Sequence, residues 1–276
     1  MYEAFYRLRE KPFSILPDPD MIYWGQNHRL AFAMLEFGVM NNAGFTVITG
    51  EIGSGKTTLM RYLLRKIDKN ITVGLISNTP RGKAKLLQWV MMSLDQPFDD
   101  TYPVLFKRLQ RFLHEQYSRG GRTILIVDEA QNLEWEALEE LRMLSNINAD
   151  KDQYLQIILL GQPQLKDLLR SPQLVQFAQR VSSDFHLKAL EPNEVRDYVD
   201  YRLKAAGSQV KLFSDEACRT IAHASRGIPR TINILCDTAL VYGFAVSAES
   251  ITAEVVTKVI ENKSQYGVLP LTPLPT

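Results

Sequence analysis

The sequence predicts an α/β protein in which a five-stranded parallel sheet carries helices on both faces and is followed by a small helical region. Three observations lead to this prediction. Apolar runs of strand length alternate with segments of helical periodicity up to about residue 190. The runs are apolar throughout, which is typical of parallel strands buried on both faces. Beyond residue 190 every segment has helical spacing, so this part is predicted to be all-helical.

Each element of the α/β region has its own signal in the residues. The first 25 residues are rich in proline and aromatic side chains and predict an irregular arm that packs on the main body. Short apolar runs predict five strands, at 44–50, 71–77, 122–130, 154–162 and 183–190. Apolar residues at helical spacing predict helices over 27–42, 56–67, 83–94, 103–118, 136–147, 164–171 and 174–181.

The helical region begins at "EPNE", a sequence typical of a helix start. Four helices are predicted in it, over 192–206, 214–225, 230–246 and 252–262. We therefore divide the chain into four parts: an N-terminal arm with the first helix (1–43), an α/β core (44–190), a helical lid (191–263) and a flexible tail (264–276).

Composition sets broad limits on function. The chain has 276 residues and a net charge of only +1, so no global basic field of the kind found in many nucleic-acid-binding proteins is expected. Cys218 and Cys236 lie in predicted helices and suggest buried thiols in a reducing compartment. No signal peptide or membrane-spanning run is visible. We expect a cytoplasmic protein, with docking at the inner membrane through a partner as a further possibility.

A phosphate-binding motif follows the first predicted strand. "GEIGSGKT" (50–57) fits G-x-x-x-x-G-K-[ST] and opens a predicted helix, as in P-loop nucleotide-binding proteins. The glycines let backbone N–H groups surround a phosphate, and the helix N-terminus adds positive partial charge. Lys56 would reach the β- and γ-phosphates, and the Thr57 hydroxyl would bind Mg²⁺. The predicted nucleotide-binding residues here are Gly50, Glu51, Ile52, Gly53, Ser54, Gly55, Lys56, Thr57 and Thr58.

A pair of acidic residues ends the third predicted strand. In "TILIVDEAQ" (123–131) an apolar run delivers Asp128 and Glu129 to the carboxyl edge of the sheet, where ligands of open α/β sheets bind. Asp128 would hold the hydrated Mg²⁺, and Glu129 would orient and polarise an attacking water. Glutamate directly after the aspartate favours hydrolysis over a simple nucleotide switch. ATP and Mg²⁺ are therefore the predicted cofactors, and an ATPase is the predicted enzyme.

Further segments resemble the AAA+ ATPases, most closely the ExeA/GspA (general secretion pathway protein A-like) group, which is related to TnsC-type transposition ATPases. The segments that carry this resemblance include "GEIGSGKTT", "LIVDEAQNL", "ILLGQPQL", "FAQRV" and "RGIPRTINILCDTAL", and with the N-terminal arm they span residues 2–243. The resemblance implies a five-stranded sheet with a C-terminal helical lid, which agrees with the pattern of elements above.

The resemblance also implies roles for single residues. Gln162 in "ILLGQP" would contact the γ-phosphate or the attacking water, the alternative being a cap of the next helix. Arg180 in "FAQRV" lies in the segment resembling the one that carries the arginine finger, which acts on the site of a neighbouring subunit, and Arg170 is its competitor. Arg230 in "GIPRTIN" would lean over the phosphates from the lid, with Arg226 as the weaker candidate.

The base of the nucleotide has a candidate site in "MIYWGQNHRLAF" before the first strand. In similar proteins this region lines the adenine, so Tyr23, Gly25 and His28 would lie near the base. Packing within the N-terminal arm is the alternative explanation for these residues.

Two processes are open for the ATPase. The first is a homo-oligomeric ring or filament with shared sites that assembles or regulates an envelope machine for secretion or polysaccharide export. Members of the group usually continue with a transmembrane segment and a peptidoglycan-binding region, and because this chain ends after the lid we expect a stand-alone soluble motor. The second is a DNA-associated regulator of transposition. A kinase or GTPase lacks a guanine motif, and a non-hydrolysing scaffold would not need Lys56, Asp128 and Glu129.

Binding to DNA would require a local basic face. Two groups of residues are candidates: Arg81, Lys83 and Lys85 after the second strand, and Lys107, Arg108 and Arg111 on a predicted helix. A solvated face is the simpler explanation for both groups. DNA is therefore an open partner but not the favoured one.

Overall fold

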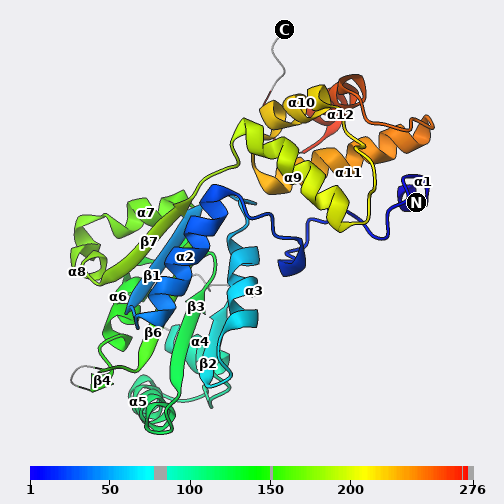
Figure 1. Ribbon diagram of the computed structural model, residues 1–276. Helices are drawn as coiled ribbons and strands as arrows, with labels where there is room; N and C mark the ends of the chain where they lie inside the picture. The colour runs from blue at the N-terminus through cyan, green and yellow to red at the C-terminus, as the bar shows by residue number, and fades with distance from the viewer. Residues whose placement is uncertain (78–85, 150–151, 269, 273–276) are drawn as a thin grey trace. The chain divides into compact units, whose positions relative to one another are not determined.

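The computed structural model describes residues 1–77, 86–149, 152–268 and 270–272. The chain forms two compact units (Figure 1). The helical unit comprises Met1–Arg29, Glu51–Arg61 and Lys188–Thr276, and the α/β unit comprises Leu30–Gly50 and Tyr62–Leu187.

The α/β unit is built on one parallel sheet with the strand order β2-β3-β6-β1-β7. The strands are β1 (Phe45–Gly50), β2 (Ile71–Ile76), β3 (Arg122–Val127), β6 (Leu155–Gly161) and β7 (Val181–Leu187). The predicted five-stranded parallel sheet is therefore confirmed. Val127 pairs with Leu159 and Thr49 with Gly161, so the carboxyl ends of β3, β6 and β1 meet at one edge.

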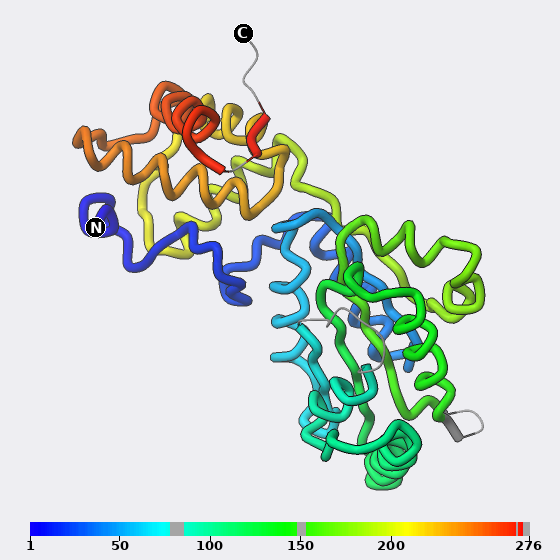
Figure 2. The backbone as a smooth tube through the Cα atoms, turned by 180° about the vertical axis from the view of Figure 1, so that it is seen from behind, coloured from blue at the N-terminus to red at the C-terminus, as the bar shows by residue number. Residues whose placement is uncertain are grey.

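Helices cover both faces of this sheet, as the views from opposite sides in Figures 1 and 2 show. Helix α2 (Gln26–Met40) lies over the face seen in Figure 1. The opposite face packs against α4 (Leu86–Ser93), α5 (Tyr102–Ser118), α6 (Trp135–Leu144), α7 (Pro163–Leu169), the 3-10 turn η3 (Pro172–Leu174) and α8 (Val175–Ala178). Helix α3 (Lys56–Lys66) follows the phosphate-binding motif. The structure adds a short hairpin that the sequence did not predict, β4 (Asn148–Ala149) with β5 (Asp152–Gln153).

The core of the α/β unit follows from the strand sequences. All six residues of β1 and all seven of β6 are buried, which explains why these strands lack a polar alternation. Leu105, Leu109 and Leu113 of α5 recur every four residues and form its buried stripe. The sheet is therefore a rigid platform for residues that follow its carboxyl edge.

The helical unit contains α9 (Pro192–Ala205), α10 (Asp215–Ser225), α11 (Pro229–Ala245) and α12 (Ala253–Tyr266). Helix α9 starts at the predicted place, with Pro192 in its first turn and a capping box between Glu191 and Glu194. Helix α12 ends at Tyr266, beyond the predicted lid boundary at residue 263.

The N-terminal arm packs into the helical unit and includes α1 (Tyr2–Phe5) and η1 (Pro19–Met21). Its buried apolar residues in the core of that unit are Tyr2, Tyr6, Leu8 and Phe13. The buried Arg202 of α9 donates to the carbonyls of Pro12 (2.6 Å) and Ser14 (3.4 Å). Residues 1–29 thus group with the lid helices, not with the rest of the predicted 1–43 segment. The predicted domain boundaries remain a proposal.

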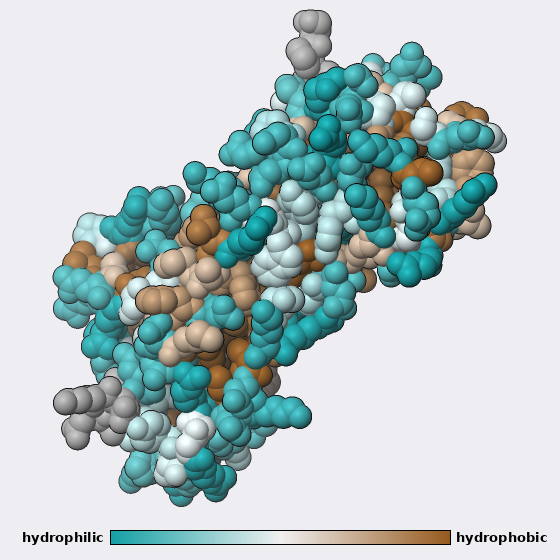
Figure 3. Space-filling model, in the orientation of Figure 1, coloured by the Kyte–Doolittle hydropathy of each residue, from teal (hydrophilic) through white to brown (hydrophobic). Residues whose placement is uncertain are grey.

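Apolar side chains also reach the surface. Figure 3 shows them gathered over the α/β unit around α2, where Leu30, Phe37 and Met40 are exposed. Within the described part of the chain, we find no helix with the length and apolar character needed to cross a membrane.

Candidate functional site

The phosphate-binding loop follows β1 and ends where α3 begins at Lys56. The Ser54 N–H donates to the Glu51 carbonyl (3.1 Å), which closes the turn. Gly53 and Gly55 have φ values of +80° and +105°, a region that favours glycine. The Leu59 N–H closes the first helical bond, to Gly55 (3.0 Å). The backbone N–H groups that precede Leu59 lie in the first turn of α3. The first turn of a helix is suited to bind an anion.

Lys56 is buried, and its ammonium donates to the Glu51 carbonyl (3.0 Å). The side chain therefore folds back along its own loop. Its ammonium lies beside the backbone turn that the sequence predicts to bind phosphate.

His28 lies against the same loop. Its Nε2 is 3.0 Å from the Ser54 carbonyl oxygen, and only 6% of the residue is exposed. Because the carbonyl can only accept, Nε2 carries the proton and Nδ1 is an acceptor. Nδ1 is buried and has no hydrogen bond within the described residues. Burial lowers the pKa of His28 from its usual value of 6.5, with the Ser54 carbonyl and Glu194 acting in the opposite direction.

The other two predicted adenine residues lie where α2 and α9 start. The ring of Tyr23 packs against those of Tyr198 and Tyr201, with centroids 5.8 Å apart in each pair. The carboxylate of Glu194 accepts the N–H of Gln26 (3.2 Å) beside Gly25. These contacts fit packing within the arm, and an adenine contact by Tyr23, Gly25 and His28 stays a prediction.

Arg230 starts α11 next to the phosphate-binding loop. Its N–H donates to the Gly53 carbonyl (3.2 Å), and a Cβ added to Gly53 would lie 2.5 Å from the Cβ of Arg230. Pro229 in the first turn fixes the start of the helix. The competitor Arg226 caps α10 instead, and its Nε donates to the Thr272 hydroxyl (2.7 Å). The structure thus brings Arg230, and not Arg226, against the loop.

A second group of residues follows the carboxyl ends of β3 and β6 in the α/β unit. Asp128 is buried, and its Oδ1 accepts the N–H of Glu129 (2.9 Å). Glu129 has φ 54° and ψ 38°, a left-handed conformation, and precedes the 3-10 turn η2 (Ala130–Asn132). A residue with a Cβ adopts this conformation at a cost of about 1–3 kcal/mol, a strain found most often at functional sites.

Two glutamine amides hold the carboxylate of Glu129. Its Oε2 accepts from Nε2 of Gln131 (2.6 Å) and from Nε2 of Gln162 (3.1 Å). The backbone N–H of Gln162 donates in turn to Oε1 of Gln131 (2.9 Å). Gln162 precedes α7, but its side chain makes no capping bond, so the capping alternative is not what the structure contains. Gln131 was missed by the sequence analysis, although it lies inside the motif "DEAQ".

The two arginine-finger candidates lie on the surface of the α/β unit. Arg180 is exposed, and its Nη1 donates to the Ser145 hydroxyl (3.3 Å) at the end of α6. Arg170 is exposed at the end of α7. The choice between them stays a prediction.

The six basic residues proposed for DNA binding differ in how they are placed. Arg81, Lys83 and Lys85 lie outside the described residues. Lys107 and Arg111 are exposed on α5. Arg108 donates to the Pro97 carbonyl (2.9 Å) and to Asp100 (3.4 Å), so its charge is partly used within the fold.

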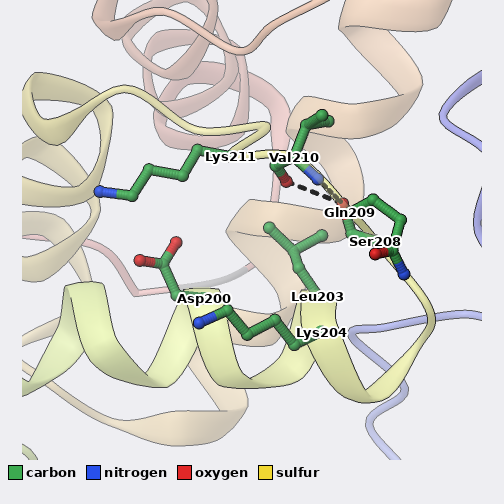
Figure 4. A pocket seen from close by; sticks show the side chains of 7 residues that line it. All are labelled: Asp200, Leu203, Lys204, Ser208, Gln209, Val210 and Lys211. Carbon is green, nitrogen blue, oxygen red and sulfur yellow. Dashed lines mark hydrogen bonds between the residues drawn. The ribbon is translucent and has the colours of Figure 1, made fainter.

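The helical unit also has a surface hollow of ≈ 350 Å³ at the end of α9 (Figure 4). It is lined by Asp200, Leu203, Lys204, Ser208, Gln209, Val210 and Lys211. None of the predicted site residues lines this hollow, and Ser208 is hydrogen-bonded to Val210 within its own loop. It therefore has no part in the candidate site.

The parallel sheet, the phosphate-binding loop and the acidic pair after β3 define a P-loop protein of the AAA+ class. A family model described as an AAA domain matches residues 39–169. The chain is 38% identical, over 253 residues, to general secretion pathway protein A of Aeromonas hydrophila. The match covers 91% of this chain and 46% of that protein, so the chain spans less than half of the relative's length. The chain thus contains an AAA domain, and over most of its length it is similar to a protein of the ExeA/GspA group.

Solved structures agree on the fold. Cdc6p from Pyrobaculum aerophilum aligns with a TM-score of 0.66 at 15% identity, covering 93% of this chain and 70% of that one. The ORC2 protein of Aeropyrum pernix aligns with a TM-score of 0.62 at 15% identity, covering 90% and 68%. At such identities the likeness concerns the fold alone.

Proposed function

We propose that this protein binds ATP with Mg²⁺ and hydrolyses it, and that hydrolysis drives or regulates the assembly of a larger machine. The observation that carries the proposal is the carboxylate of Glu129, which two amides hold after β3 in a chain that has a complete phosphate-binding loop. The two hydrogen bonds orient the carboxylate, as a general base must be oriented toward its water.

Phosphate binding falls to residues 50–58. Their glycines and the start of α3 supply backbone N–H groups, and Lys56 supplies the positive charge. Arg230, whose N–H is bonded to Gly53, would add charge from the start of α11. The positive φ values of Gly53 and Gly55 explain why the loop needs glycine at both positions.

The donor chemistry fits magnesium. The described residues contain no group of three His, Cys, Asp or Glu placed to hold a metal alone. Magnesium is usually bound by one or two protein oxygens together with phosphates. The Thr57 hydroxyl and the Asp128 carboxylate are such oxygen donors. When bound, the ion neutralises charge on the phosphate oxygens.

Hydrolysis would use the second group. Glu129 would accept a proton from water as the water oxygen bonds to the γ-phosphorus and the bond to the β–γ bridging oxygen breaks, giving ADP and phosphate. Gln162 would contact the γ-phosphate or the water. Arg180, with Arg170 as its competitor, would stabilise the developing charge from a neighbouring subunit of a ring or filament.

The process is inferred from the relative. Similarity to general secretion pathway protein A supports a role in secretion. We propose that the protein acts in the cytoplasm, or docked on an inner-membrane partner, with an envelope machine for secretion or polysaccharide export. A DNA-associated role of the TnsC type is the second candidate: Lys107 and Arg111 are exposed on α5, whereas Arg108 is engaged by Asp100.

The enzyme activity is tested by phosphate release from ATP with Mg²⁺. The wild type should hydrolyse ATP, Lys56→Ala should lose nucleotide binding, and Glu129→Gln should bind ATP while its turnover falls about 100-fold or more. Wild-type release no faster than that of Lys56→Ala, with and without added duplex DNA, would contradict the proposal.

The shared site is tested by mixing two inactive variants. Arg180→Ala leaves the carboxylate intact and Glu129→Gln leaves the arginine intact, so a mixed oligomer contains some complete sites. Activity should reappear on mixing and should not reappear when Arg180→Ala is mixed with itself. If only Arg170→Ala gives this complementation, then Arg170 is the finger.

A further inference from the structure

We propose that Gln131 is a positioning residue for hydrolysis, because its amide couples the carboxylate of Glu129 to Gln162. This inference rests on the ATPase function proposed above. No motif assigned Gln131 a role, yet it makes two of the three hydrogen bonds in this group.

The hydrogen bonds fix which way the Gln131 amide faces. Its oxygen accepts the backbone N–H of Gln162 (2.9 Å), and a backbone N–H can only donate. The –NH₂ end must therefore face Glu129, whose Oε2 it contacts at 2.6 Å. The amide has one orientation, and that orientation donates to the carboxylate.

Both amides donate to the same oxygen of Glu129. Oε2 receives Gln131 and Gln162, and Oε1 has no hydrogen bond within the described part of the chain. The carboxylate is thus anchored through one oxygen, while the other is available to a water. Without an anchor, the side chain could rotate among its rotamers on a backbone that is already in a left-handed conformation.

The surrounding structure leaves room for this amide. A Cβ on Gly161 would lie 3.1 Å from Oε1 of Gln131 and 2.7 Å from Leu165. Ala130 and Leu133 are buried on either side of the turn, and the Asn132 N–H closes it on the Glu129 carbonyl (3.0 Å). The position of Gln131 is therefore set by the fold and does not depend on a flexible surface loop.

The link also connects the two predicted catalytic side chains. Gln131 binds the backbone of Gln162, whose own amide binds Glu129, so the three residues form a closed ring of hydrogen bonds. A displacement of Gln162 on contact with phosphate would be passed to Glu129 through this ring. A positioning residue of this kind affects the chemical step and not nucleotide affinity.

The test is a double-mutant cycle between Gln131→Met and Glu129→Gln. Methionine keeps the length of the side chain and removes both hydrogen bonds. Gln110→Met, at an exposed position on α5, is the matched control. The turnover number kcat is measured from steady-state hydrolysis of radiolabelled ATP, ATP affinity by titration, and folding by the thermal unfolding midpoint.

We expect Gln131→Met to lower kcat about tenfold or more with ATP affinity within about twofold of wild type. In the Glu129→Gln background the same change should have no further effect, because its target carboxylate is gone. Gln131→Glu should be at least as impaired, because it replaces the donor with a second carboxylate. Gln110→Met should match the wild type.

Several results would overturn the inference. Unchanged kcat in both Gln131 variants would do so, as would an equal loss in the Glu129→Gln background or a loss of ATP affinity, since each means that Gln131 does not act through Glu129. If Gln131→Met unfolds, the same criteria apply to Gln131→Glu. A wild type that does not hydrolyse ATP would instead overturn the proposed function itself, and this inference with it.

Discussion

The phosphate-binding loop and the Glu129 group are held in different ways. Around the loop, His28, Lys56 and Arg230 all bond to carbonyl oxygens of the backbone, at Ser54, Glu51 and Gly53. Around Glu129, the hydrogen bonds run mainly between side chains. Backbone geometry follows from glycine positions and a helix start, which a sequence displays. Side-chain geometry depends on rotamers and on the turn beneath them, which a sequence does not display.

The difference suggests different tolerances. A substitution at Gly53 disturbs the backbone carbonyl that Arg230 binds, so it affects binding and stability together. A substitution at Gln131 or Gln162 leaves the backbone in place and removes an orienting contact. We therefore expect changes in the loop to act on nucleotide affinity, and changes around Glu129 to act on turnover.

Of the variants that test this difference between the loop and the Glu129 group, Gln162→Met is expected to have the largest effect. Loss of the amide removes a donor to Glu129 and any contact with phosphate or water, so kcat should fall about 100-fold, as it does when one oriented donor is lost from an active site. ATP affinity should change little. The matched control is Gln173→Met at an exposed position in η3, measured in the same phosphate-release assay.

A fall in ATP affinity equal to the fall in kcat would break the comparison. It would mean that Gln162 contributes to holding the nucleotide in the ground state, as the loop does.

A smaller effect, of about tenfold on ATP affinity, is expected for Gly53→Ala. The added Cβ would lie 2.5 Å from the Cβ of Arg230, and the φ of +80° disfavours alanine. Gly120→Ala is an apt control, because Gly120 has a φ of +76° and no atom within 4 Å of an added Cβ. Both variants should lose about 1 kcal/mol of unfolding free energy from backbone strain, measured in urea.

Only Gly53→Ala should also lose ATP affinity and a further part of its stability, since only it meets another residue. If the two variants behave alike, the contact between Gly53 and Arg230 has no functional weight.

The sequence predicted the loop well and the second group only in part. The five strands, and the positions of Lys56, Asp128 and Glu129 after strands β1 and β3, follow from apolar runs and glycine spacing. Gln131 could not be found in this way, because its role requires the left-handed backbone at Glu129 and the short turn after it. The adenine contact predicted for His28 stays a prediction, and the sequence did not indicate its contact with the Ser54 carbonyl. That contact joins residues 26 positions apart, and local periodicity carries no information about it.

The arm illustrates the same limit. Its aromatic residues were expected to pack on the main body, and Tyr2, Tyr6 and Phe13 are buried in the core of the helical unit. The carbonyls of Pro12 and Ser14 are bound by Arg202, a residue nearly 190 positions later. No sequence pattern within the arm predicts Arg202 as its partner. The buried arginine would instead have been expected on the solvated side of α9.

The smallest expected effect is a pH dependence of stability that comes from His28. Its pKa is lowered in the folded protein by burial, while the unfolded chain keeps the usual value of 6.5. Between the lowered value and 6.5 the unfolded state binds a proton that the folded state does not. The contribution of His28 is therefore fully present above pH 6.5 and is lost as the pH falls below it, at no more than about 1.4 kcal/mol per pH unit.

His28→Gln is the variant that isolates this effect, because the glutamine amide can still donate to the Ser54 carbonyl but does not titrate. Urea unfolding at about pH 7.5 and 5.5 should show a larger loss of stability for the wild type than for the variant, by up to about 1 kcal/mol. Other histidines contribute equally to both proteins and cancel in the difference. An equal loss in both proteins would mean that His28 takes up its proton in the folded state, and that the loop tolerates a charged imidazole against its backbone.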